Sequence, residues 1–164
     1  KQRVIIASAI IPHPKLLIAD EPTTALDVTI QAEILDLIKR LQREHDLSML
    51  LITHDMGIVA DIADEIIIMY LGKVLESGGK DSIYQNPSHP YTRGLLQCIP
   101  RKQNRNKTLY TIKGSVEQLT APPARCVFAP RCELCEEGCL LAAPAPVRVG
   151  ERHIVYCPLG VRRG

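Results

Sequence analysis

The sequence has no long apolar run, no signal-peptide layout and no strong excess of one charge. Its longest candidate membrane stretch, 66–71, is far too short to span a bilayer. The first eleven residues do not lead into a small-residue cleavage site. A formal net charge of +2 is close to neutral, so no broad nucleic-acid-binding surface is indicated. These absences predict a soluble intracellular protein with no nucleic-acid partner.

The apolar residues are numerous and regularly spaced. They make up 46% of the 164 residues, which is enough for a folded domain. An uninterrupted apolar run suits a strand that is buried on both faces of a parallel sheet, so an α/β fold with a parallel sheet core is predicted. Strands are expected at 16–19, 48–53, 65–71, 73–76 and 109–113, and helices at 1–11, 28–44 and 56–63.

Two acidic residues, Asp20 and Glu21, end the first apolar run and precede Pro22. An unpaired buried charge costs several kcal/mol, so acids at the carboxyl end of a buried parallel strand need a cation or a reacting group as partner. Mg²⁺ bound to phosphates is the natural candidate. The alternative is a solvated turn, which an isolated apolar-Asp-Glu string would favour.

Four short motifs occur in order: QRV at 2–4, LLIADEP at 16–22, TTALD at 23–27 and ITHD at 52–55. Together they resemble the later half of an ABC-type ATPase nucleotide-binding domain, which implies a P-loop (RecA-like) fold, ATP and Mg²⁺ as cofactors, and a dimer with a second ATPase subunit. The family's phosphate loop, GxxxxGK[ST], and its LSGG signature are not in the sequence. We therefore expect a fragment cut after the signature, inactive by itself.

The resemblance also implies roles for single residues. Asp20 would bind Mg²⁺, usually through water, and Glu21 would act as the general base on the attacking water. His54 would contact the γ-phosphate as the second catalytic residue, although a lone histidine is more often structural. Gln2 and Asp27 would belong to the nucleotide site. Asp27 also suits the N-cap of the helix at 28–44, and both roles are compatible.

The segment 86–96, NPSHPYTRGLL, is a proline-bounded loop that runs into a short helix, and nothing in it demands catalysis. It resembles the extension of ATPase subunits of oligopeptide and dipeptide importers, so His89 is interpreted as a family marker. The resemblance implies membrane permease subunits as partners, an extracytoplasmic peptide-binding protein as an indirect one, and a peripheral location at the cytoplasmic face of the membrane. The ATPase domain is expected at 1–86 and a small irregular extension at 87–164.

Five of the six cysteines lie in the last 39 residues. Disulfides are disfavoured in the reducing compartment of an ATP-driven motor, and a zinc site would suit the closely spaced Cys132, Cys135 and Cys139. Cys126, Cys132, Cys139 and Cys157 instead resemble the pattern that holds a [4Fe–4S] cluster in some dipeptide-importer ATPases. Cys135 could replace one of these ligands or be a spare thiol. A purely structural tail is the remaining alternative.

Three functions stay open at this point. The leading hypothesis is the ATP-hydrolysing subunit of an ABC importer of oligopeptides or dipeptides. A soluble ABC ATPase of DNA repair or translation shares the DEP and ITHD motifs, but its nucleic-acid partner fits poorly with a nearly neutral chain. The tail could also be a stand-alone iron–sulfur or other metal-binding module.

Overall fold

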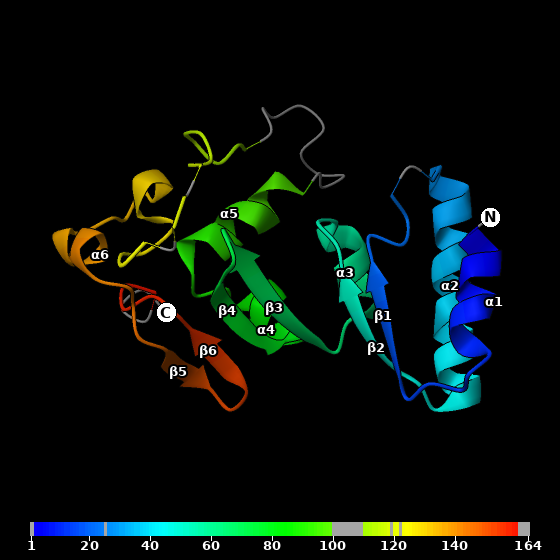
Figure 1. The fold of residues 1–164 in the computed structure, drawn as a ribbon. Helices are drawn as coiled ribbons and strands as arrows, with labels where there is room; N and C mark the ends of the chain where they lie inside the picture. Colours follow the sequence, from blue (N-terminus) through cyan, green and yellow to red (C-terminus); the bar gives the residue numbers. More distant parts are fainter. Residues whose placement is uncertain (1, 25, 100–109, 119, 122, 161–164) are drawn as a thin grey trace. The chain divides into compact units, whose positions relative to one another are not determined.

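The computed structural model describes residues 2–24, 26–99, 110–118, 120, 121 and 123–160. The chain divides into two compact units, 1–55 and 56–164, which we call unit 1 and unit 2 (Figure 1). The division lies between the second predicted strand and the helix that follows it. The predicted boundary at residue 86 lies inside unit 2, and the two-domain division remains a prediction for the complete protein.

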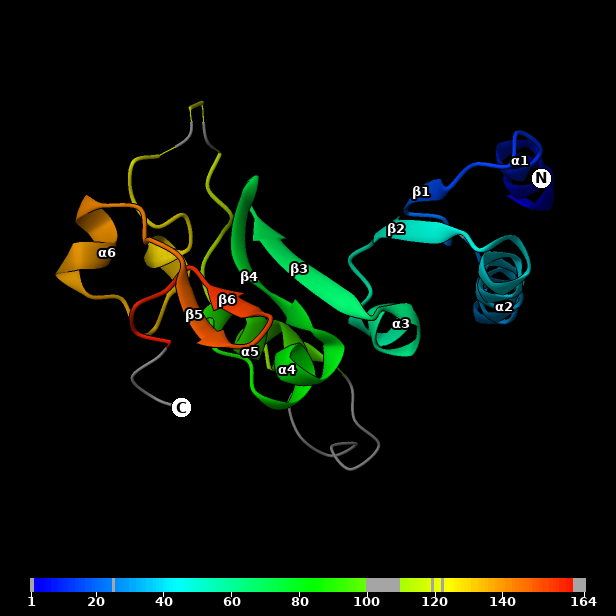
Figure 2. The ribbon, with the colours of Figure 1, turned by 90° about the horizontal axis from the view of Figure 1, so that it is seen from below.

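Unit 1 is a strand–helix–strand arrangement preceded by a helix. Strands β1 (Leu16–Asp20) and β2 (Ser48–Ile52) are parallel, with Leu16 opposite Ser48 and Asp20 opposite Ile52. Helix α2 (Val28–His45) connects them, and α1 (Gln2–Ile10) precedes β1. Both helices lie on the same side of the strand pair (Figure 2). The predicted α/β class with parallel strands is confirmed.

The core of unit 1 forms where the two helices meet. Ile6 and Ile10 of α1 pack with Ile34 and Ile38 of α2, as the helical spacing of these residues predicts. Helix α2 is capped by Asp27, whose carboxylate accepts a hydrogen bond from the backbone N–H of Ile30 at 2.9 Å. This cap satisfies one of the free N–H groups at the start of the helix.

The opposite face of the strand pair is not covered by the described residues of unit 1. Leu16 and Ile18 of β1 are 52% and 61% exposed, and Leu50 and Ile52 of β2 are 48% and 46% exposed. The expectation that the first strand is buried on both faces is therefore wrong for this chain. Its other face packs as expected, since Ala19 is buried and Met49 of β2 contacts the helical core.

Unit 2 is built on an antiparallel sheet with the strand order β3-β4-β6-β5. Strand β6 pairs with β4, so the last strands of the chain extend the sheet that β3 and β4 begin. The tail is thus less irregular than predicted. The elements of unit 2 are α3 (Met56–Ile62), β3 (Glu65–Tyr70), β4 (Lys73–Gly79), α4 (Lys80–Gln85), α5 (Pro90–Cys98), the 3₁₀ helix η2 (Ala129–Arg131), α6 (Glu137–Leu141), β5 (Val147–Gly150) and β6 (His153–Val155).

Aromatic residues from distant segments fill one part of the unit 2 core. The rings of Tyr70, Tyr91 and Phe128 pack together, with centroids 4.9 to 5.6 Å apart. The strand predicted at 109–113 is wrong for residues 110–113, which have no regular structure, while Leu109 lies outside the described residues. No helix in the described ranges combines the length and the apolar character needed to cross a membrane.

Candidate functional site

The ends of the two parallel strands bring Glu21 and His54 together. The Oε1 atom of Glu21 lies 2.7 Å from Nδ1 of His54, although 33 positions separate the two residues in the chain. The backbone N–H of Glu21 donates to the carbonyl of Ile52 at 2.9 Å and thereby continues the strand pairing by one residue. Because the carboxyl ends of parallel strands meet at one edge, the residues that follow them become neighbours.

A third residue, Thr24, completes this contact. Its hydroxyl donates to Oε2 of Glu21 at 2.7 Å, so both carboxylate oxygens of Glu21 have a hydrogen-bond partner. The backbone of Glu21 is left-handed, with φ of 46°, which turns the chain sharply after β1. No role was predicted for Thr24 from the sequence. The available signal was its position three residues after Glu21, because a turn after β1 can bring these two side chains together.

The hydrogen bonds shift the pKa values of this pair in opposite directions. The bond from Thr24, and then that with His54, lower the pKa of Glu21, while the bond to Glu21 raises the pKa of His54. The side chains are 37% and 83% exposed, respectively. Glu21 is therefore an ionised carboxylate in reach of solvent. Each of its oxygens has a second lone pair, so it can also accept a proton or a hydrogen bond from a water.

The other residues predicted for the nucleotide site lie at or near the same turn, and each has a different local environment. Asp20 is exposed at the last position of β1, directly before Glu21. The side-chain amide of Gln2 donates to the carbonyl of Pro22 at 2.8 Å and ties the start of α1 to the turn after β1. Asp27 caps α2 as described above. The roles of these residues toward ATP and Mg²⁺ stay predictions, and Ala25 of the TTALD motif lies outside the described residues.

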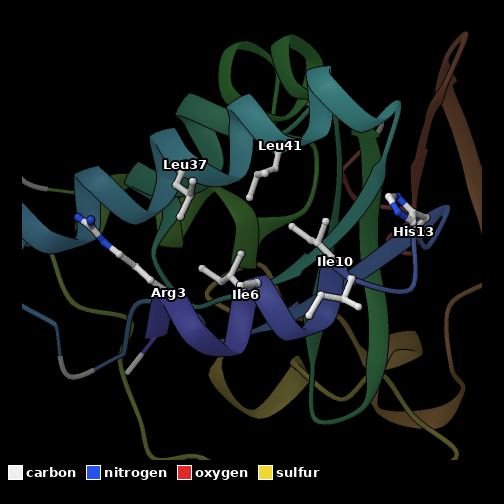
Figure 3. A pocket seen from close by; sticks show the side chains of 8 residues that line it. Arg3, Ile6, Ile10, His13, Leu37 and Leu41 are labelled. Carbon is white, nitrogen blue, oxygen red and sulfur yellow. The ribbon is translucent and has the colours of Figure 1, made fainter.

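Unit 1 also has an open apolar groove of about 560 Å³ between α1 and α2 (Figure 3). None of its lining residues is a predicted site residue. Arg3 lies at one end of the groove and His13 at the other, and apolar side chains line the space between them. The lining residues are Arg3, Ile6, Ala7, Ile10, Ile11, His13, Leu37 and Leu41.

The cysteines of unit 2 form a second candidate site. Each of Cys126, Cys132 and Cys157 is close enough to other cysteines of the tail for their charges to influence its pKa, and Cys139 is among the neighbours of Cys126 and of Cys157. The backbone N–H of Cys126 also donates to the carbonyl of Cys139 at 3.0 Å. The structure therefore brings the four predicted ligands into one neighbourhood.

Backbone groups hydrogen-bond to three of these sulfurs. Burial raises the pKa of Cys126, Cys132 and Cys157, that of Cys132 to about 11. The hydrogen bonds act in the opposite direction because they stabilise the thiolate. Each comes from a residue two or three positions after the cysteine: Phe128 and Ala129 at Cys126, Leu134 at Cys132, and Leu159 and Gly160 at Cys157.

The fit of a metal group to these cysteines is partial. Four sulfur ligands with backbone N–H donors are the chemistry that soft metal ions and iron–sulfur clusters require. Within the described ranges, however, no three His, Cys, Asp or Glu side chains converge closely enough to be a metal-binding group. The donors are therefore present as neighbours and would have to draw together around a metal. Cys135 hydrogen-bonds to the Cys139 side chain at the edge of this group.

Unit 2 also contains a buried carboxylate–histidine pair that no sequence motif indicates. Glu76 of β4 is fully buried, and its Oε1 atom lies 2.7 Å from Nε2 of His153 in β6. The only signal was an acid directly after the apolar residues Val74 and Leu75. No local pattern connects this acid to a histidine that follows 77 positions later.

A family model described as the C-terminal region of oligopeptide/dipeptide transporters matches residues 75–139. The chain is 48% identical over 163 residues to a peptide import ATP-binding protein of Brucella ovis, a match that covers 96% of this chain and 48% of that protein. It is 47% identical over 163 residues to the dipeptide transport ATP-binding protein DppD of Bacillus subtilis, covering 99% of this chain and 49% of that protein.

The oligopeptide transport ATP-binding protein OppD of Haemophilus influenzae is 47% identical over 142 residues, covering 87% of this chain and 44% of that protein. The chain thus spans about half the length of the curated relatives that it matches. Among solved structures, cbiO1 from Clostridium perfringens, part of the ABC transporter complex cbiONQ, is similar with a TM-score of 0.48 and 34% identity. That match covers 51% of this chain and 34% of cbiO1.

Proposed function

We propose that the chain belongs to the family of ATP-binding proteins of peptide importers and that it is part of a subunit that hydrolyses ATP to drive uptake of oligopeptides or dipeptides. The observation that carries the proposal is the contact of Glu21 with His54 at the ends of two parallel strands. The chain has no GxxxxGK[ST] sequence, and we expect it to be inactive by itself.

In this proposal Glu21 is the general base. Its lowered pKa keeps it ionised at neutral pH, and its exposure lets the attacking water reach it. Thr24 and His54 orient its carboxylate. The imidazole of His54 would contact the γ-phosphate when ATP is bound. Mg²⁺ would neutralise phosphate charge when bound, with Asp20 as its ligand. Gln2 would support the site through Pro22, and Asp27 through the loop that begins α2.

The partners follow from the same proposal. A second ATPase subunit would form a dimer with this one, and membrane permease subunits would receive the motion that ATP binding produces. An extracytoplasmic peptide-binding protein would contribute indirectly. The subunit would lie at the cytoplasmic face of the membrane. The names of the relatives support peptide import over DNA repair or translation, which needs a nucleic-acid partner.

Substitution of Glu21 in the full-length subunit tests the proposal. Glu21→Gln should retain ATP binding but lower phosphate release by roughly 100-fold or more, because the amide cannot accept the proton. The matched control is Glu33→Gln, since Glu33 is an exposed acid of the same unit that pairs with Arg3. Near-normal turnover in Glu21→Gln, with the control also active, would remove Glu21 from the role of base.

We also propose that Cys126, Cys132, Cys139 and Cys157 hold a [4Fe–4S] cluster. The backbone hydrogen bonds to three of these sulfurs support this proposal, because such bonds stabilise the thiolates that a cluster needs. A bound cluster would cross-link the segments that carry the four cysteines. Zinc is the alternative occupant for the same four thiolates.

Anaerobic reconstitution separates these occupants. Iron and acid-labile sulfide in equal amounts would support the cluster, whereas bound zinc without sulfide would support the alternative. The variant Cys126→Ser should lose the bound metal, and Cys135→Ser is the matched control that should keep it. Loss of metal in Cys135→Ser with retention in Cys126→Ser would instead make Cys135 the fourth ligand.

A further inference from the structure

Glu76 is a fully buried carboxylate in the middle of β4. A buried carboxylate is costly unless hydrogen-bond donors surround it. Among the described residues, Glu76 has three such partners. The backbone N–H of Ser88 donates to Oε1 at 2.6 Å, and that of His89 donates to Oε2 at 3.0 Å. The imidazole Nε2 of His153 lies 2.7 Å from Oε1.

These donors come from two segments that are far apart in the sequence. Ser88 and His89 belong to the loop that starts α5, where the His89 side chain accepts a hydrogen bond from the backbone of Tyr91 and caps the helix. His153 begins β6, whose pairing with β4 places Glu76 opposite Val155 and Ser77 opposite Ile154. Because this pairing is short, the contact between the Glu76 and His153 side chains is an additional link between β6 and β4.

The same two segments hold Cys157. This cysteine follows β6 by two residues, is 7% exposed, and is preceded by Tyr156, whose N–H donates to the carbonyl of Leu75 at 2.8 Å. The turn that follows Cys157 packs against the loop that contains Ser88. A Cβ atom on Gly160 would lie 2.5 Å from the carbonyl oxygen of Ser88, so only glycine fits there.

We propose that Glu76 positions Cys157 within the group of tail cysteines, by joining the Ser88–His89 loop and β6 into one support. This assigns a role to the Ser88–His89 loop as well: its two backbone N–H groups hold the carboxylate of Glu76, and the carbonyl of Ser88 is the group against which the turn after Cys157 packs. Without the carboxylate, β5 and β6 detach locally and Cys157 moves away from the other thiols. The metal-binding part of this inference rests on the proposed cysteine site, but the placement of Cys157 does not.

Thiol alkylation of the metal-free chain under reducing conditions tests the placement. In Glu76→Gln, the rate of alkylation of Cys157 with iodoacetamide, followed by mass spectrometry, should rise roughly tenfold or more because local opening exposes the thiol. Cys98 of α5 is the internal reference, and its rate should stay the same. The matched control is Glu65→Gln, since Glu65 forms an exposed ion pair with Arg152 in the same β5–β6 hairpin.

A second measurement uses Co²⁺ as a spectroscopic probe for thiolate ligands. The native chain should show sulfur-to-cobalt charge-transfer absorption, and Glu76→Gln should show it with roughly tenfold weaker Co²⁺ affinity. If the native chain binds no Co²⁺ while the alkylation rates change as expected, the proposed cysteine site fails and the role of Glu76 stands.

A third variant covers the case in which Glu76→Gln does not fold. His153→Leu removes only the contact from β6 and leaves the bonds from Ser88 and His89 to Glu76 in place. It should expose Cys157 without changing Cys98. An unchanged alkylation rate of Cys157 in His153→Leu, and in Glu76→Gln if it is folded by circular dichroism, would overturn the proposal.

Discussion

Two carboxylate–histidine pairs with the same separation occupy the two units of this protein. Glu21 and His54 in unit 1 are 2.7 Å apart, as are Glu76 and His153 in unit 2. The first pair is 37% and 83% exposed, whereas the second is 0% and 7% exposed. The two pairs are equivalent in the distance between carboxylate and imidazole, but they differ in their exposure to water.

The difference in burial gives the two pairs different physical properties. Water screens the exposed pair, so its contribution to stability is small and its members can exchange partners with water or a ligand. The buried pair has no such freedom, because removing one partner leaves the other group buried without compensation. An exposed pair at strand ends suits catalysis, and a buried pair between strands suits support of another site.

The largest effect on stability is expected at the buried pair. Glu76→Gln should lower the free energy of unfolding by about 3 kcal/mol, because it removes the charge on which three donors converge. Urea unfolding of the chain measures this loss. Glu21→Gln is the comparison variant and should leave the urea midpoint unchanged. Equal losses in the two variants would show that burial does not distinguish the pairs.

A second prediction concerns His89, which contacts the buried pair through its backbone. Burial lowers the pKa of this side chain from its ordinary 6.5 to about 4. The unfolded chain therefore takes up a proton below about pH 6.5 that the folded chain refuses until about pH 4, and stability falls as the pH falls through this window. Between about pH 7 and pH 5 the loss should be about 2 kcal/mol.

His89→Asn removes this sensitivity while keeping a side chain that caps α5. Unfolding measured at both pH values should show a smaller acid-induced loss in the variant than in the native chain. Asp27→Asn is a suitable control, since it alters a cap of the other unit. An unchanged acid-induced loss in His89→Asn would mean that His89 is not the group responsible.

In unit 1, a smaller effect is expected at the start of α2. Asp27→Ala should lower the free energy of unfolding by about 1 kcal/mol, because the N–H of Ile30 loses its acceptor. Asp27→Ser retains an acceptor and should lose much less. Urea unfolding checks both variants. If the two variants were equally destabilised, the carboxylate charge and not the capping bond would be the cause.

The smallest effect is a change in titration without a change in fold. The contact with Glu21 raises the pKa of His54, so the imidazole remains protonated at higher pH than an isolated histidine. The interaction is present below the ordinary pKa of histidine and is lost as the pH rises through the raised one. In Glu21→Gln, the NMR titration midpoint of His54 should move down toward the ordinary value, whereas Glu33→Gln should leave it in place.

The local elements of unit 1 were predictable because their signals are local. Helix α2 was expected at 28–44 and is observed at Val28–His45, since apolar spacing and the Asp27 cap act within a few residues. The exposure of Leu16 and Ile18 was not predictable, because the burial of a strand depends on what packs against it.

In unit 2, too, contacts with distant residues override a local sequence pattern. Residues 110–113 alternate like a strand, but Arg131 binds the carbonyl groups of Ile112 and Lys113.

The order of the motifs by itself predicted the resemblance to ATP-binding subunits of peptide importers, and the apolar runs predicted that two acids and a histidine lie at the ends of two strands. Only the tertiary structure decided that Glu21 and His54 touch, that Thr24 takes the other carboxylate oxygen, and that Glu76 meets His153. The physical reason is range. Backbone periodicity and capping act over a few residues, whereas a hydrogen bond across 77 positions exists only after strands have paired and excluded water.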